Sequence, residues 1–226
     1  MFLQSNEKSV LNVNHCNISL KKTPLISDLS FSIKKGKVLT LMGPSGSGKS
    51  SLLNYLSGTL DTGFQANGAI ELDGIRLDRM CTQNRNVGIL YQTPLLFPHM
   101  TNLENLLFAI DAKEQGLTRL ERLNLAMSKL AELGLEAKAK ELPTALSGGQ
   151  QARIALLRTL LSSPNYLLLD EPFGKLDPEL RQSVRRFTLD QIEIANIPTL
   201  LVTHDDEDKI AMGGDFIELV NLSKRG

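Results

Sequence analysis

The segment from residue 43 to residue 50 constrains the fold more than any other part of the sequence. It reads Gly-Pro-Ser-Gly-Ser-Gly-Lys-Ser and follows the apolar run Val38–Met42. Glycine allows the backbone conformations that a tight turn needs, so the order favours a buried strand, a loop and then a helix. Leucines recur at helical spacing after the loop, and Gly58 is a stop signal. We therefore predict a strand–loop–helix unit of an α/β fold.

The spacing of this segment also has a chemical consequence. Backbone N–H groups of such a loop point inward at phosphate oxygens, and the following helix adds its partial positive charge. Lys49 is expected to reach the β- and γ-phosphates of a nucleotide, and the Ser50 hydroxyl to bind Mg²⁺. An ordinary glycine- and serine-rich turn is the alternative, which the full spacing disfavours. The expected nucleotide-binding residues are Gly43, Pro44, Ser45, Gly46, Ser47, Gly48, Lys49, Ser50 and Ser51.

Composition excludes several classes of protein. Lys and Arg together number 25, as do Asp and Glu, and there is no Trp, so no nucleic-acid partner is expected. The two cysteines, Cys16 and Cys81, lack metal-ligand spacing and are expected to be free thiols. The polar N-terminus is unlike a secretory signal, and no apolar run approaches the ~20 residues needed to cross a bilayer. We expect a cytoplasmic protein that meets a membrane only through partners.

Strands alternate with helices along most of the chain, which predicts a mainly parallel sheet. Short β segments at 10–13, 29–33 and 69–72, with a turn at Asp73-Gly74, predict an N-terminal antiparallel β subdomain. Further strands are expected at 166–169, 199–203 and 216–220. Helices are expected from about 149 to 161, from Asp177-Pro178 onward and from about Asp206.

Residues 93–163 interrupt this alternation with a block that is entirely helical in pattern. Thr101 with Glu104, and Thr118 with Glu121, have the spacing of capping boxes, and Gly134 is a C-terminal cap candidate. We interpret the block as a helical subdomain inserted into one domain that spans residues 1–226.

Acidic residues end one of the predicted strands. Asp170 and Glu171 follow the apolar run 166–169, where open α/β sheets bind ligands. Asp170 is placed to hold Mg²⁺, and Glu171 to orient and deprotonate an attacking water. His204 follows another predicted strand, so we assign it to the γ-phosphate and the same water. Isolated residues of these types are more often structural or solvated; the neighbouring phosphate loop favours function here.

These segments occur in the order found in the ABC (ATP-binding cassette) ATPases, and the chain resembles that family over nearly its whole length. Tyr91-Gln92 looks like the Q-loop, Asp170-Glu171 the Walker B pair, Leu176-Asp177 the D-loop and His204 the switch histidine. The resemblance implies ATP and Mg²⁺ as cofactors. It adds Gln92 to Glu171, His204 and Lys49 as catalytic residues, and to Ser50 and Asp170 as metal-binding residues. The signature motif is matched by Leu146, Ser147, Gly148, Gly149 and Gln150.

The signature has a particular implication in this family. Ser147 and the amides of Gly148 and Gly149 are expected to begin a helix and to form a second anion site. By resemblance, this site caps the γ-phosphate that a second copy of the chain holds. The active form would then be a head-to-tail dimer with ATP between its subunits.

The sequence departs from the family's pattern at two positions. The family usually has an aromatic residue that stacks on adenine before the phosphate loop; the position falls near Leu20, and no Phe, Tyr or Trp occurs from Val10 to Ser30. Gly174 stands where a serine is common, close to the D-loop residue Asp177. The contact to adenine is left open.

The family's transport role would require separate transmembrane permease subunits. Residues 93–105 are similar to importers for anions, iron, thiamine and polyamines, which are fed by a periplasmic or surface solute-binding protein. Leu95, Leu96 and Phe97 could form a groove for the permease or belong to the core. The chain ends soon after the last expected strand, so no C-terminal regulatory domain is expected. Alternatives are lipoprotein-release or cell-division ABC ATPases, ribosome- or DNA-acting ABC proteins, and a generic P-loop kinase or GTPase.

Overall fold

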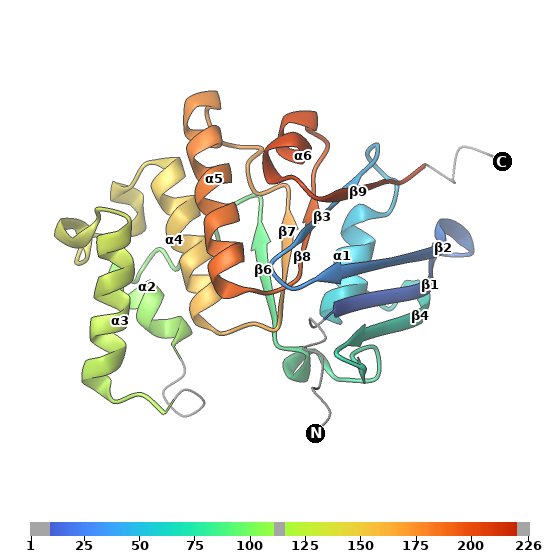
Figure 1. Cartoon of the computed structure of the whole chain (residues 1–226), viewed down its shortest axis with the longest axis horizontal. Coiled ribbons are helices and arrows are strands. Elements are labelled where there is room, and N and C mark those ends of the chain that lie inside the picture. The colour runs from blue at the N-terminus through green and yellow to red at the C-terminus, as the bar shows by residue number, and fades with distance from the viewer. Residues whose placement is uncertain (1–9, 111–115, 221–226) are drawn as a thin grey trace, which may run out of the picture.

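Figure 1 shows the computed structural model of the chain, in which residues 10–110 and 116–220 are described. The polar N-terminal segment that argued against a secretory signal lies mostly outside these residues. Among the described residues, none of the helices combines the length and the apolar character needed to cross a membrane.

The described strands form two sheets. The central sheet is entirely parallel and has the strand order β6-β7-β8-β3-β9; the second is antiparallel and has the order β2-β1-β4-β5. The fold is therefore α/β with a parallel core sheet and an antiparallel N-terminal sheet, as predicted. The parallel strands are β3 (Val38–Met42), β6 (Val87–Tyr91), β7 (Tyr166–Asp170), β8 (Thr199–Val202) and β9 (Asp215–Glu218). The antiparallel strands are β1 (Val10–Leu20), β2 (Thr23–Lys34), β4 (Phe64–Leu72) and β5 (Ile75–Arg76).

Helices connect and cover these strands. The α-helices are α1 (Lys49–Ser57), α2 (Asn102–Ala109), α3 (Arg119–Glu132), α4 (Gly148–Leu161), α5 (Pro178–Ala195) and α6 (Asp206–Met212). Short 3-10 helices occupy Thr82–Arg85, Glu136–Lys138 and Pro143–Ala145. The capping boxes of Thr101 and Thr118 are both formed, because each hydroxyl accepts from the backbone N–H of the glutamate three residues on.

Alternation along the parallel strands explains the layers of the fold. In β7, Leu168 packs toward α1 and the antiparallel sheet, whereas Leu167 and Leu169 pack against the helices of the opposite face. Helix α1 thus lies between the two sheets, and α4 and α5 cover the other face of the parallel sheet (Figure 1). Both faces of the central sheet are buried, as its uninterrupted apolar strands require.

Helices α2, α3 and α4 share a separate apolar core at the other end of the molecule from the antiparallel sheet (Figure 1). Leu106 of α2, Leu130 of α3 and Ile154 of α4 are fully buried in it. Helix α4 contributes to this core and also packs on the parallel sheet. The boundaries of an inserted subdomain at residues 93 and 163 stay a prediction.

Several element bounds differ from the sequence-based prediction. Strands β1, β2 and β4 are much longer than expected, because polar residues such as Asn12 alternate with buried Leu11 and Val13, and irregular pairing around Cys16 lets the strand continue. Strand β9 begins at Asp215 and ends at Glu218. Helix α3 ends at Glu132, and Gly134 follows its cap with a left-handed φ of 66°.

Candidate nucleotide-binding and catalytic site

The carboxyl ends of the parallel strands bring the predicted site residues together. Asp170 at the end of β7 pairs in register with Val202 of β8, which in turn pairs with Leu41 of β3. The phosphate loop leaves β3, Glu171 leaves β7 and His204 follows β8. Segments far apart in sequence therefore meet at one edge of the sheet.

The loop from Gly43 to Gly48 is folded as a cradle. Gly43, Gly46 and Gly48 have φ values of 145°, 80° and 96°, which side chains disfavour. A Cβ atom at Gly43 would lie 2.7 Å from the carbonyl oxygen of Leu219. Helix α1 then begins at Lys49 without an acidic residue in its first turn or a side-chain cap. Its amide groups and positive dipole end are therefore available to an anion.

Lys49 directs its ammonium group into this cradle. Its Nζ donates to the carbonyl oxygens of Gly43 at 2.6 Å and Pro44 at 3.0 Å, and its side chain is largely buried. The hydroxyl of Ser47 is also buried and has no hydrogen-bond partner within the described structure. A buried cation and an unsatisfied donor beside free amides fit a bound phosphate group.

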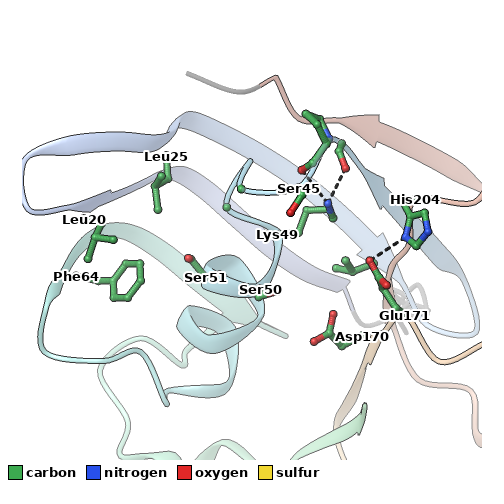
Figure 2. Close-up of a pocket in the computed structure, with 15 residues that line it drawn as sticks. Leu20, Leu25, Ser45, Lys49, Ser50, Ser51, Phe64, Asp170, Glu171 and His204 are labelled. Carbon is green, nitrogen blue, oxygen red and sulfur yellow. Dashed lines mark hydrogen bonds and ion pairs between the residues drawn. The ribbon is translucent and has the colours of Figure 1, made fainter. Parts of the chain in front are cut away.

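A cavity of about 680 Å³ extends from this cradle in both directions. Lys49, Ser50, Ser51, Asp170, Glu171 and His204 line it, as Figure 2 shows. Leu20, Leu25 and Phe64 line its other end, on the far side of the phosphate loop from Glu171 and His204. One end of the cavity is therefore polar and the other apolar.

Asp170, at the end of β7, is a partly buried carboxylate that lines the cavity. Burial raises the pKa of Asp170, the Glu171 carboxylate beside it raises that pKa further, and the Lys49 ammonium partly opposes both. The described residues contain no cluster of three or more His, Cys, Asp and Glu side chains that could hold a metal alone. The Asp170 carboxylate and the Ser50 hydroxyl provide hard oxygen ligands, which suit Mg²⁺ when nucleotide phosphates complete its shell.

Glu171 and His204 face one another at the polar end of the cavity. A hydrogen bond of 2.9 Å joins Nδ1 of His204 to Oε1 of Glu171 (Figure 2). Glu171 has a left-handed φ of 47°, an unfavourable backbone conformation for this residue type. Such strain is found where a site fixes a side chain's direction, and here it aims the carboxylate at His204 and the cavity.

Side chains of α5 and α6 fix the segment that carries His204. Thr203 donates its hydroxyl to Asp208 at 2.5 Å, and Arg185 pairs with the same buried carboxylate. Arg181 binds Asp205 at 2.8 Å and also donates to the carbonyl oxygen of Leu176 at 3.3 Å. Arg181 therefore links the histidine segment to the residue that precedes Asp177.

Gln92 lies outside the residues that line the cavity. A Cβ atom at Gly174 would be 2.8 Å from Nε2 of Gln92, so the glycine permits this close approach. The predicted roles of Gln92 in catalysis and metal binding are not evident from this geometry, and they stay predictions.

The signature residues form a helix start of their own. Ser147 caps α4 in a capping box with Gln150, and Gly148 and Gly149 form the first turn. Gly149 packs against Leu180 of α5, at a distance where an added Cβ atom would make an ordinary contact. None of these residues, nor Leu146, lines the cavity in the same chain. Asp177, exposed at the start of α5, does not line it either.

Several residues at the site were missed by sequence reasoning. Phe64 and Leu25 were missed because their places depend on pairing between distant strands. Arg181 and Arg185 are spaced four apart on α5, a spacing that put both on one helical face but did not identify their partners. Asp208 gave no signal beyond an acidic helix start.

The parallel sheet, the glycine-rich cradle and the acidic strand end define a P-loop nucleoside triphosphatase. Residues 26–174 match the ABC transporter family. The chain is 40% identical over 199 residues to the uncharacterised ABC transporter ATP-binding protein YnjD of Escherichia coli K12, covering 88% of this chain and 90% of YnjD. It therefore belongs to the ABC transporter family, and its class is that of the ATP-binding, ATP-hydrolysing subunits, as the sequence predicted.

Two further relatives are named for their substrates. The putrescine transport ATP-binding protein PotG of E. coli K12 is 35% identical over 95% of this chain. The sulfate/thiosulfate import ATP-binding protein CysA of E. coli K12 is 38% identical over 84% of it. The chain spans only 55% of PotG and 52% of CysA, about half of each.

Proposed function

We propose that this chain binds and hydrolyses MgATP to drive a multi-subunit importer of a small solute. The observation that supports this most strongly is the shared cavity. It joins a phosphate cradle, a buried lysine, two carboxylates and a histidine at the ends of three adjacent strands. These are the groups that phosphoryl transfer to water requires.

Each side chain has a role in this proposal. Lys49 and the loop amides bind the phosphates, with Ser45, Ser50 and Ser51 as further donors at the cradle. Ser50 and Asp170, with Gln92, hold Mg²⁺, which supplies charge neutralisation when bound. Glu171 accepts the proton of the attacking water, and His204 holds Glu171 and the γ-phosphate in position.

We infer that the working form is a head-to-tail dimer. The Ser147 to Gln150 segment offers a second helix start with small residues, yet it is separate from the cavity of its own chain. In a dimer it would cap the γ-phosphate held by the partner, near the exposed Asp177. Loss of the γ-phosphate removes those contacts and lets the dimer open.

A groove next to the helical core suits a permease subunit. Phe97 lies with its ring centroid 4.8 Å from that of Phe108 and 5.1 Å below the Arg158 guanidinium. Leu95 and Phe108 are 56% and 63% exposed, whereas Leu96 packs against two core clusters. Leu96 is therefore largely a core residue, and we assign the permease surface to the groove lined by Phe97 and Phe108, together with the exposed Leu95.

Import rather than another ABC activity is favoured by the similarity to CysA, which is named as a sulfate/thiosulfate import protein. The chain would then act at the inner face of the cell membrane through its permeases, with a solute-binding protein as an indirect partner. An ABC ATPase of lipoprotein release or cell division is the alternative. It shares the same catalytic groups, so the permease genes next to this gene would distinguish the two.

A direct test is the ATPase activity of the purified chain with Mg²⁺. The rate per subunit should rise with protein concentration, since two copies build each site. Co-expression with neighbouring permease genes should yield a complex, which Phe97→Glu should disrupt without abolishing ATP binding. An activity independent of concentration would contradict the dimer, and no ATP hydrolysis would contradict the function.

A further inference from the structure

The apolar end of the cavity depends on the register between strands β1 and β4, which the sequence did not predict. Leu20, the last residue of β1, lies directly opposite Phe64, the first residue of β4. Residues paired in this way on antiparallel strands have side chains on the same face of the sheet. Both side chains line the cavity, together with Leu25 of β2 (Figure 2).

Local structure holds these side chains in place. Lys21 and Lys22 have φ values of 46° and 71°, so β1 and β2 join through a tight two-residue turn directly after Leu20. On the other side, Asp61 accepts from the N–H groups of Gly63 and Phe64, which fixes the entry into β4. Phe64 packs partly on the main core and leaves the rest of its ring at the cavity.

The direction of a bound nucleotide follows from the two ends of the cavity. Its phosphates lie on the cradle, with the terminal phosphate toward Glu171 and His204. The base must then extend to the opposite end, where Leu20, Leu25 and Phe64 lie. None of these three side chains carries a polar atom, so the base is held by its ring face rather than by its edges.

We propose that Phe64 is the residue that contacts the nucleotide base. Leu20 and Leu25 supply aliphatic walls, and Phe64 provides an aromatic ring that is absent from the segment before the phosphate loop. Apart from His204 at the polar end, Phe64 is the one cavity-lining residue with an aromatic ring in the part of the chain that the structure describes. This inference rests on the proposed binding of ATP.

The test compares ligands with and without a base. In Phe64→Ala, the dissociation constants of ATP and GTP should rise about tenfold, as for loss of one base–aromatic contact. The dissociation constant of inorganic tripolyphosphate should be unchanged. The matched control is Phe31→Ala, another half-buried phenylalanine on the same core that does not line the cavity.

A second variant gives a direct signal. The chain contains no tryptophan, so Phe64→Trp introduces a single fluorophore at the site. ATP and GTP should quench it and tripolyphosphate should not, whereas Phe31→Trp should respond to neither. The inference about Phe64 would be overturned by an unchanged ATP affinity in Phe64→Ala, or by equal responses of Phe64→Trp to ATP and tripolyphosphate. Neither result would contradict the proposed function. Failure of the wild-type chain to bind either ligand would instead overturn the proposed function.

Discussion

The carboxylate of Glu171 lies 2.9 Å from Nδ1 of His204, although the two residues follow different strands. The contact exists because β7 and β8 are adjacent in the sheet and the backbone N–H of Glu171 donates to Val202 at 2.9 Å. The left-handed φ of Glu171 then turns its side chain toward the histidine. The proposed base of the reaction is thus oriented before substrate binds, which is the condition for efficient proton transfer.

Glu171→Gln should lower the rate of ATP hydrolysis by about 100-fold or more, because the variant lacks the base. It should still bind MgATP and should trap a dimer, since the closed state keeps its γ-phosphate and loses one repelling charge. Size-exclusion chromatography with MgATP measures this. Glu179→Gln, an exposed acid in the first turn of α5, is the control and should behave as wild type. A Glu171→Gln chain that stays monomeric in saturating MgATP would count against closure by ATP.

Lys49→Ala should weaken nucleotide binding itself. The variant removes the only side-chain cation among the described residues that line the cavity, apart from His204 when it is protonated. A charge-assisted hydrogen bond of this kind contributes about 1.5–3 kcal/mol, so we expect the ATP dissociation constant to rise at least tenfold in titration calorimetry. Lys34→Ala, at the exposed end of β2, should leave it unchanged. Equal affinities of the two variants would remove Lys49 from the phosphate site.

Ser147→Arg should abolish hydrolysis and leave ATP binding by the monomer intact. The new side chain fills the start of α4, where the partner's γ-phosphate is expected, but Ser147 does not line the cavity of its own chain. Paired measurements of ATP affinity and turnover test this. The control for added positive charge is Asp190→Arg, because Asp190 is exposed in the C-terminal half of α5. Normal turnover in Ser147→Arg would favour a generic P-loop enzyme instead.

Acidification should weaken Mg²⁺-dependent nucleotide binding. The loss should begin at a higher pH than it would if the carboxyl ligand had an ordinary pKa. Burial and Glu171 raise the pKa of Asp170, and the protonated acid cannot bind the cation. A carboxyl whose pKa is raised on folding favours the folded state at low pH, and that contribution is lost as pH rises through the raised value. Mg²⁺ binding therefore competes with this proton. The affinity for MgATP should fall as pH is lowered through that value, and Asp170→Asn should remove this dependence. An unaltered pH profile in Asp170→Asn would exclude Asp170 as the titrating ligand.

Arg185→Met should destabilise the fold and loosen the histidine segment. The change leaves the buried Asp208 carboxylate with only Thr203 as a partner among the side chains described. Breaking a buried ion pair by removing one member costs about 3 kcal/mol or more. The urea midpoint of Arg185→Met should be lower than that of the wild type. The midpoint of the control Arg186→Met, a change at its exposed neighbour, should be unchanged. Equal midpoints would show that the network does not stabilise this segment.

The sequence predicted the parts of the site that lie within short segments. The phosphate loop, the acidic pair and His204 are recognisable because each follows an apolar strand directly, so local pattern and position at the sheet edge coincide. Phe64 could not be predicted, because its contact with Leu20 depends on the β1–β4 register and on strands longer than their apolar runs. Arg181 and Arg185 were missed for a similar reason. Charged residues on a helix are usually solvated, and the partners of these two lie much later in the chain, at the N-cap and in the first turn of α6.

We propose that each active site combines the phosphate loop of one copy with the signature of another. Mixing Lys49→Ala with Ser147→Arg tests it most directly, because each chain supplies the group that the other lacks. Half of the dimers in an equimolar mixture are mixed, and each contains one intact site of two. The mixture should therefore recover about a quarter of the wild-type ATPase rate, although each variant alone is inactive. A mixture no more active than the separate variants would contradict the composite site.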